Sequence, residues 1–324
     1  MAREIFSFLV WVGQRVSDVL LNLMAEGVPH ISVCICTFRR SHFLNDLLHV
    51  LDLQKTESSF TFSLIVVDND ASESAKETVL QFRNTSSREV RCFVEPEQNI
   101  ALARNKALAN AKGDFIAFID DDELPVTDWL IKLFQTCQAY HVDGVLGPVL
   151  PRFEGSPPAW VKRGGFCDRP SHATGFKIDW NEGRTGNLLI RREILDGIDP
   201  VFRPEFGSGG EDRNFFRRMI EHGRIFIWCN EAVAYERVPP LRWKRSFMIR
   251  RALLRGKMAL NQHRGVGDLT KSFLAVIGYT LALPILFVIG HHLFMKYLIK
   301  ICDHCGKLLA FVGLDPVRDR YVLD

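Results

Sequence analysis

The sequence predicts an α/β protein with a mainly parallel sheet flanked by helices, followed by a C-terminal helical, membrane-associated segment. Short apolar runs of strand length alternate with helical stretches between residues 31 and 140, and this alternation is typical of parallel pairing. Polar residues follow directly behind several of these runs. Near the C-terminus, residues 272–290 carry no charged side chain, so the run approaches the length needed to cross a bilayer.

Strands are expected where an apolar run is nearly continuous, because a parallel strand is covered on both faces. Helices are expected between them, and the Ala-rich one ends before Gly113, a common stop signal. The expected order is strand 31–37, helix 39–53, strand 63–67, helix 73–82, strand 90–94, helix 99–111, strand 115–119 and helix 128–140.

Length and composition exclude several classes of protein. The chain has 324 residues, 47% hydrophobic and 24% charged, which is ordinary for a globular protein and unlike a disordered or fibrous one. The net charge of +3, from 41 basic and 38 acidic residues, is too balanced for a dedicated nucleic-acid binder, so no nucleic-acid partner is expected. The eight cysteines are scattered, as in a reduced intracellular protein. Cys302 and Cys305 form one CxxC, without the second ligand pair that a zinc site needs.

Both ends of the chain are apolar, in different ways. Residues 1–28 are expected to form an amphipathic helix, because Arg15 and Asp18 interrupt the apolar run and no cleavage site follows it. The run at 272–290 is a candidate membrane span, and residues 293–314 are expected to return as a hairpin arm or an interfacial helix. The alternative for both C-terminal runs is a buried helical subdomain.

A basic run precedes the C-terminal apolar segment. Positive residues stay on the cytoplasmic side of a membrane and attract anionic headgroups, although a solvated helical face is the plainer alternative. The run comprises Arg242, Lys244, Arg245, Arg250, Arg251, Arg255, Lys257 and Arg264.

Four consecutive acids, Asp120 to Glu123, follow the apolar strand at 115–119. Thr37 and Asp68 end two other strands, and ligands of parallel sheets bind beyond the carboxyl ends of the strands. The repulsion among adjacent carboxylates is relieved by a divalent cation, Mg²⁺ or Mn²⁺, with a diphosphate completing its coordination. The alternative is a solvated acidic turn in which Asp128 caps the next helix. No GxGxxG follows the first strand, which disfavours a dinucleotide-dependent dehydrogenase.

A second acidic pair, Glu211 and Asp212, follows the glycine-rich stretch 206–210 and opens a helix over 212–222. Acids at a helix N-terminus are stabilised by free N–H groups, but capping accounts for only one of the two. The glycines before the pair indicate a close approach by substrate or a mobile loop.

Residues 31–238 resemble the family 2 glycosyltransferases of the GT-A fold, and among these the bacterial exopolysaccharide enzymes of the succinoglycan type. The matching segments are ISVCICTFRR, LIVVDND, EQNIALARNKALANAKGDFIAFIDDDE, GRTGNLLIRREIL and FGSGGEDRNFFRRM. The resemblance implies an inverting enzyme that moves a sugar from a nucleoside-diphosphate donor, with a UDP-sugar the first expectation, to an acceptor hydroxyl.

The same resemblance implies the donor-binding residues. Thr37 and Asp68 would contact the nucleoside, and Asp120 would approach the ribose. Asp122 would coordinate the metal against the diphosphate, and Asp121 would share this work. Asn99 and Arg104 belong to the stretch near the nucleotide. The plainer alternatives are a helix N-cap for Asn99 and a surface ion pair for Arg104.

On the acceptor side, the resemblance implies that Asp212 is the catalytic base and that Glu211 positions acceptor hydroxyls or orients its loop. Asn187 hydrogen-bonds substrate or simply closes a turn. Glu236 stands where some relatives carry a metal-contacting histidine, so it either serves in that place or leaves the metal to Asp122.

These expectations combine into one hypothesis. An amphipathic segment (1–28), a GT-A domain (29–240) and a basic, membrane-associated unit (241–324) act at the cytoplasmic face of the inner or plasma membrane. A sugar, expected to be a hexose, passes to a glycan, expected to be lipid-linked, in polysaccharide synthesis. Alternatives are a polyprenyl-phosphate or protein acceptor, a non-catalytic membrane-anchored scaffold, and a nucleotidyltransferase. The last is disfavoured because the segment after the first strand lacks glycine.

Overall fold

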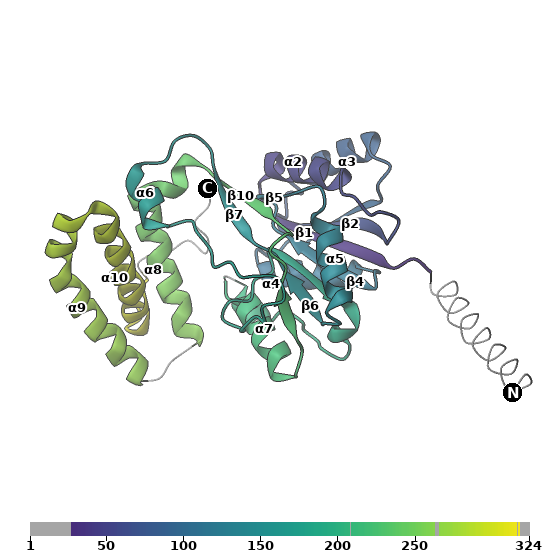
Figure 1. The fold of residues 1–324 in the computed structure, drawn as a ribbon. Coiled ribbons are helices and arrows are strands. Elements are labelled where there is room, and N and C mark those ends of the chain that lie inside the picture. Colours follow the sequence, from purple (N-terminus) through teal and green to yellow (C-terminus); the bar gives the residue numbers. More distant parts are fainter. Residues whose placement is uncertain (1–26, 208, 263–265, 316, 318–324) are drawn as a thin grey trace, which may run out of the picture.

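The computed structural model describes residues 27–207, 209–262, 266–315 and 317. The helix expected over residues 1–28 lies almost entirely outside the described residues. Figure 1 shows a catalytic half built around a twisted sheet and, beside it, a separate layer of long C-terminal helices.

The main sheet has seven strands in the order β3-β2-β1-β4-β8-β6-β9. Of these, only β8 runs antiparallel to its neighbours β4 and β6, so the prediction of a mainly parallel sheet is confirmed. The strands are β1 (His30–Thr37), β2 (Thr61–Asp68), β3 (Val90–Val94), β4 (Phe115–Ile119), β6 (Gly144–Leu146), β8 (Asn187–Arg191) and β9 (Phe226–Trp228).

Helices cover both faces of this sheet. Successive side chains of a strand point to opposite faces, so Val33 of β1 packs into one core cluster and Cys34 into the other. The first cluster is closed by α2 (Ser41–Asp52), α3 (Lys76–Thr85) and α5 (Trp129–Ala139). The second is closed by α4 (Ile100–Asn110) and α7 (Glu211–Glu221). The helices lie where the sequence predicts them, with ends that differ by up to three residues.

A small second sheet lies over the carboxyl edge of the first. Its strands are β5 (Glu123–Pro125), β10 (Ala234–Val238) and β7 (Val149–Phe153), with β10 in the middle. Because β10 pairs antiparallel with β5, Glu236 stands directly opposite Glu123. The remaining short elements are α6 (Ala159–Gly164), η1 (Arg192–Leu195), η2 (Pro204–Phe206) and η3 (Pro240–Trp243).

The C-terminal layer consists of α8 (Arg245–Gln262), α9 (Val266–Ile289) and α10 (His291–Phe311). Helix α10 packs on α8 and α9 and also touches α6 of the catalytic half. Gly256 and Gly306 allow the close crossing of α8 and α10, since a Cβ at either would lie within 2.2 Å of a backbone oxygen of the other helix.

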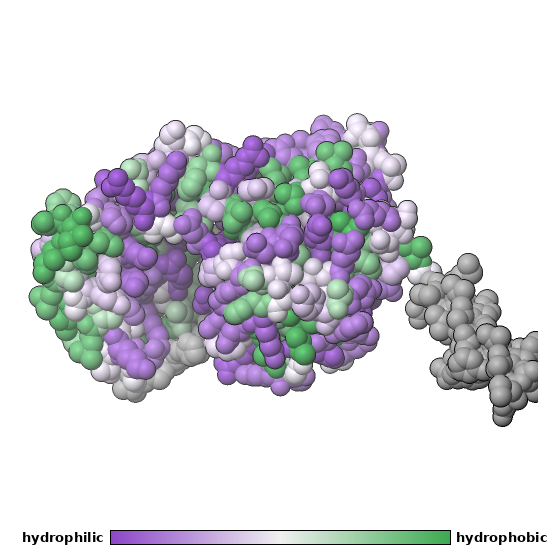
Figure 2. All heavy atoms as spheres, viewed as in Figure 1, coloured by the Kyte–Doolittle hydropathy of each residue, from purple (hydrophilic) through white to green (hydrophobic). Residues whose placement is uncertain are grey.

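Helix α9 exposes most of its apolar side chains. Leu281 is 74% exposed and Val288 is 86% exposed. Figure 2 shows the hydrophobic surface gathered over the C-terminal helices, while the catalytic half beside them is mostly hydrophilic. Among the described residues, the stretch Gly267–Ile289 is the one helix long and apolar enough to cross a membrane.

Candidate active site

The acids that follow β4 lie beside the end of β1. Thr37 ends β1, and its hydroxyl donates a hydrogen bond to Oδ2 of Asp121 at 2.7 Å. Asp121 and Asp122 are both buried. Burial, together with the charge of Asp122, raises the pKa of Asp121 to about 7. The alternative of a solvated acidic turn is therefore wrong, because these carboxylates are enclosed.

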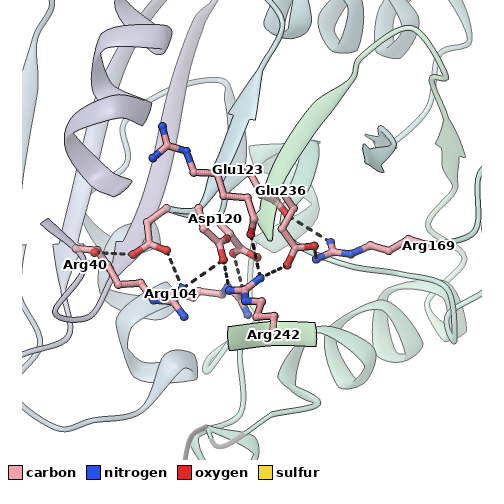
Figure 3. A network of polar contacts seen from close by, with 11 residues as sticks. Arg40, Arg104, Asp120, Glu123, Arg169, Glu236 and Arg242 are labelled. Carbon is pink, nitrogen blue, oxygen red and sulfur yellow. Dashed lines mark hydrogen bonds and ion pairs between the residues drawn. The ribbon is translucent and has the colours of Figure 1, made fainter. Parts of the chain in front are cut away.

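Arg40 and Arg242 compensate the charge of Asp122, and Figure 3 shows both arginines in the polar network of the site. Nη2 of Arg242 lies 2.6 Å from Asp122 Oδ2, and Nη1 of Arg40 lies 3.4 Å from the same oxygen. Arg40 also reaches Oδ1 of Asp121 at 3.3 Å. The expectation that Arg242 belongs to a lipid-facing basic run is wrong. The structure buries Arg242 in η3, turned into the site.

Glu123 and Glu236 would repel each other across the small sheet, and arginines again relieve the repulsion. Arg169 binds Glu123 Oε1 at 3.3 Å and Glu236 Oε2 at 2.6 Å. Arg242 takes the other oxygen of Glu236 at 2.6 Å. Glu236 is thus held by arginines through both of its carboxylate oxygens. Burial raises the pKa of Glu123 well above its ordinary value, and its Oε2 has no hydrogen-bond partner among the described residues.

Gly186 marks a tight place in this wall. A Cβ at this position would stand 2.7 Å from Glu123 Oε1 and 2.9 Å from Asp120 Oδ2. A side chain at position 186 would therefore have to displace the carboxylates of Glu123 and Asp120, which Arg169 and Arg104 hold.

Arg104 of α4 joins the two acidic clusters. Its side chain is buried and pairs with Glu211 at the start of α7, while its Nη2 lies 3.3 Å from Asp120 Oδ1. Burial opposes its charge, but Glu211 and Asp120 outweigh this and raise the pKa of Arg104. The alternative of a surface ion pair is wrong for this residue. Burial also raises the pKa of Glu211 to about 7, although Arg104 acts to lower it.

Asp212, next to Glu211, has a different environment. It is half-buried, and its Oδ1 accepts the backbone N–H of Arg213 at 2.7 Å. Among the described residues it forms no ion pair, but its charge favours the protonated form of Arg104 and opposes the burial that lowers the pKa of Arg184. Gly210 precedes the pair at φ +94°, a conformation that glycine adopts without strain. One acid of the pair is therefore fixed by an arginine and the other is accessible.

Two predicted site residues, Asp68 and Asn99, form hydrogen bonds within the fold. Asp68 accepts hydrogen bonds from the backbone N–H groups of Ala75 (2.6 Å) and Asp70 (3.1 Å), and so shapes the turn before α3. Asn99 caps α4, because its Oδ1 accepts from the backbone of the first turn at 3.0 and 3.2 Å. The capping alternative thus describes Asn99, while its contact with a nucleotide stays a prediction, as does that of Asp68.

Asn187 is buried at the start of β8 and ties three segments together. Its Oδ1 accepts from the indole N–H of Trp129 at 2.7 Å, and its amide donates to Pro148 O (3.1 Å) and Ala232 O (2.8 Å). Its side chain thus anchors β8 in the core, and a contact with substrate stays a prediction.

The carboxylates of the site are oxygen ligands of the kind that a divalent cation prefers. Among the described residues, no group of three or more His, Cys, Asp or Glu side chains could enclose an ion by itself. Mg²⁺ and Mn²⁺ are commonly held by one or two carboxylates, with substrate phosphates supplying further oxygens. Asp122, which follows β4 beside Asp121, offers oxygens of the type that such a shared site uses, and its Oδ2 is here paired with Arg242 and Arg40.

Sequence reasoning did not assign Arg40, Arg169 or Arg242 to the site. Arg169 lies in an irregular loop and Arg242 in a short 3₁₀ turn, and neither is spaced regularly from the acids. The available signal was the excess of negative charge itself, since buried carboxylates need buried cations.

The fold is that of the GT-A glycosyltransferases. The family model "Glycosyl transferase family 2" matches residues 32–198, so this chain belongs to glycosyltransferase family 2. The resemblance to this family that the sequence predicts is confirmed.

Relatives with curated names are similar over most of the chain. It is 34% identical over 236 residues to the succinoglycan biosynthesis protein ExoM of Rhizobium meliloti, covering 72% of this chain and 75% of that protein. It is 25% identical over 211 residues to glycosyltransferase AglE of Haloferax volcanii, covering 65% and 67%.

Solved structures share the fold at low identity. The mannosyltransferase PcManGT of Pyrobaculum calidifontis, in complex with GDP-Man and Mn²⁺, superposes with a TM-score of 0.59 at 17% identity, covering 87% of this chain and 88% of that one. TarS 1–349 of S. aureus, in complex with UDP-GlcNAc, gives 0.51 at 16% identity, covering 88% and 92%. These similarities confirm the predicted fold class.

Proposed function

We propose that this enzyme transfers a sugar, with inversion at the anomeric carbon, from a nucleoside-diphosphate donor to a hydroxyl of a growing glycan. A UDP-sugar is the proposed donor and a lipid-linked oligosaccharide of a cell-surface polysaccharide is the proposed acceptor. The observation that carries the proposal is the position of Arg104, which contacts both Asp120 and Glu211 and so places the two acidic clusters at one site.

The two acids of α7 divide the work. Glu211 is buried against Arg104 and fixes the first turn of the helix, so it serves as a positioning residue. Asp212 has a carboxylate without an ion pair among the described residues and acts as the general base. It takes the proton of the acceptor hydroxyl as that oxygen attacks the anomeric carbon from the face opposite the leaving diphosphate. Such base catalysis contributes on the order of 10²–10⁴-fold.

The cluster after β4 receives the donor diphosphate. Asp122 is the residue proposed to hold a divalent cation, which when bound supplies charge neutralisation for the departing nucleoside diphosphate. Arg40 and Arg242 already touch Asp122 and add positive charge at the same place. Thr37 orients Asp121, so that the acidic edge keeps its shape before a donor arrives.

The C-terminal layer supports a membrane location. Helix α9 has the length and apolar surface of a membrane span, and the relative ExoM is named for succinoglycan biosynthesis. We therefore place the enzyme at the cytoplasmic face of the inner or plasma membrane, where nucleotide sugars are available and a lipid-linked acceptor is within reach.

A donor screen tests the proposal. Full-length protein with Mn²⁺ is assayed for nucleoside diphosphate release, with and without lipid-linked oligosaccharide, and in parallel with polyprenyl phosphate. Asp212→Asn should lower transfer by about 10²–10⁴-fold while leaving donor binding in place. Asp122→Ala should lower both transfer and donor binding.

Asp196→Asn is the matched control, because Asp196 is an exposed acid of η1's C-terminal end, away from the acidic clusters. It should behave like the wild type. Full transfer by Asp212→Asn would show that Asp212 is not the general base. Nucleoside diphosphate release that occurs only with polyprenyl phosphate would show that the acceptor is polyprenyl phosphate and not a glycan.

A further inference from the structure

A cavity of about 230 Å³ lies beside the acidic site, and the proposed mechanism does not use it. Residues at or next to β6, β8 and β9 form its floor, and its walls come from the loop before β8 and the first turn of α7. It lies on the β8–β9 side of the sheet, whereas Thr37 and the proposed diphosphate position lie at β1 and β4.

The cavity is lined by more positive than negative charge. Arg169, Arg184 and Arg213 line it, and the acid on its wall is Glu182, which faces His172 at 3.2 Å. Arg169 is engaged by Glu123 and Glu236. Within the described ranges, Arg184 and Arg213 form no ion pair with a carboxylate. Two guanidinium groups, each with donors suited to a planar oxyanion, therefore face the same space.

A buried donor without a partner lies in the same wall. Trp228 is 7% exposed, lines the cavity, and its indole Nε1 has no hydrogen-bond partner in the described part of the chain. Indole nitrogen is a donor only, so a group that satisfies it must be an acceptor. The ring of His172 meets Trp228 edge-on at 5.5 Å, which gives the cavity an aromatic side against which a sugar ring can pack.

The cavity is also electrostatically continuous with the candidate base. Burial and the charge of Arg169 lower the pKa of Arg184, while Asp212 and Glu236 raise it. Arg213, which also lines the cavity, directly follows Asp212 on α7, so the cavity adjoins the candidate base. An anion bound here would relieve the repulsion among the arginines and would lie near the hydroxyl that Asp212 deprotonates.

We propose that this cavity binds an anionic group, a carboxylate or a phosphate, carried by the acceptor glycan close to the hydroxyl that is glycosylated. The acceptor class is thus an acidic rather than a neutral glycan. This inference rests on the proposed function, because it interprets the cavity as part of the acceptor site.

Direct binding tests it without requiring turnover. Full-length protein in detergent is titrated with methyl β-D-glucuronide, methyl β-D-glucoside 6-phosphate and neutral methyl β-D-glucoside, and binding is followed by saturation-transfer NMR. At least one anionic glycoside should bind about tenfold more tightly than the neutral one, which is the size expected of a charge-assisted hydrogen bond. The two anionic arms distinguish a carboxylate from a phosphate.

Variants assign the effect to the cavity. Arg184→Gln and Arg213→Gln should each reduce the preference for the anionic glycoside toward one, and Arg184→Lys should keep part of it. Trp228→Phe should weaken anion binding several-fold because it removes the N–H and keeps the ring. Arg217→Gln is the control: it lies one turn beyond Arg213 on α7 and pairs with Glu221, and it should keep the wild-type preference.

The outcomes separate the two proposals. Equal binding of anionic and neutral glycosides, in a protein that turns over a nucleotide sugar, would overturn the anion site and leave the transferase proposal intact. An anion preference that survives in Arg184→Gln and Arg213→Gln would also overturn it. A preference lost in both variants supports the site, whichever donor the screen identifies.

Discussion

The acidic site and helix α9 each depart from the usual distribution of side chains: charged groups are buried at the site, and apolar groups are exposed on α9. At the site, carboxylates such as Asp122 and Glu123 are buried, and arginines at hydrogen-bond distance compensate them. On α9, large apolar side chains such as Leu281 and Val288 are exposed, with no comparable cover from the residues that the structure describes. Ordinary globular proteins avoid both arrangements, because both cost free energy in water.

The difference between them teaches where each cost is met. The site carries its own compensation, since every buried acid has an arginine or a hydroxyl nearby, and its geometry is therefore set by the fold. Within the described part of the chain, helix α9 has no such compensation, so we expect its apolar surface to depend on the surrounding medium. Substitutions should accordingly affect folding in the first region and lipid partition in the second.

The largest effect is expected at the bridge between the acidic clusters. Arg104→Met leaves Glu211 buried without its cation, and breaking such a pair destabilises a protein by about 3–5 kcal/mol. Urea unfolding of the full-length chain measures the loss. The double variant Arg104→Met with Glu211→Gln should recover part of it, because no unpaired charge is then left buried.

Arg217→Met provides the matched comparison for that experiment. The Arg217–Glu221 pair lies on the exposed face of α7, where ion pairs contribute only about 0–1 kcal/mol. A loss as large as that of Arg104→Met would show that the buried bridge has no special energetic role.

The converse effect is expected on α9. Leu281→Lys places a charge in the middle of the apolar stretch, where insertion into a bilayer costs about 2.5–3.5 kcal/mol. Partition into liposomes, measured by flotation, should fall by about a hundredfold. Leu53→Lys is the control, since Leu53 is 67% exposed on the catalytic half and should leave partition unchanged. Equal partition of all three proteins would mean that α9 does not enter lipid.

A smaller effect tests the packing of the acidic wall. Gly186→Ala brings a methyl group against Glu123 and Asp120, and overpacking of this kind costs about 1–3 kcal/mol. The thermal midpoint should fall, and donor binding should weaken with it because the acids are displaced. Gly197→Ala would not serve as a control, because alanine is strained at the positive φ of Gly197. Gly223→Asn serves instead: Gly223 lies in open space at a left-handed position that asparagine tolerates, so the thermal midpoint should hardly change.

The smallest effect concerns Asp70, at the turn after β2. Hydrogen bonding to Arg39 holds the pKa of Asp70 at about 2, below its ordinary 3.8. The folded state therefore binds fewer protons than the unfolded state in this range, so the stabilisation is complete above about pH 4 and lost toward pH 2. The difference in unfolding free energy between wild type and Asp70→Asn should shrink over that interval. If this difference in unfolding free energy stayed constant over the interval, Asp70 would not be the group that titrates.

The fold was largely predictable because its determinants are local. Apolar runs such as 115–119 and the stop before Gly113 locate strands and helices, and the carboxyl-edge rule places Thr37 beside the acids. The antiparallel strand β8 and the small sheet were not foreseen, because their pairing joins segments far apart in the sequence.

The site was predictable for its acids and for Arg104, but not for its other cations. Asp120 to Asp122 and Glu211–Asp212 are adjacent in sequence and carried by recognisable motifs. Arg169 and Arg242 reach the site from irregular segments, and nothing in their sequence neighbourhood distinguishes them from surface arginines. Asn187 shows the opposite case, since a motif residue proved to hold the core together.

Arg242 lies two residues beyond the point at which the sequence suggests that the catalytic unit ends, and it closes the salt bridges of Asp122 and Glu236. A truncation at residue 240 that aims to free a soluble catalytic fragment would also strip a cation from its reaction centre. A fragment engineered from this chain therefore has to extend through η3 to keep these salt bridges.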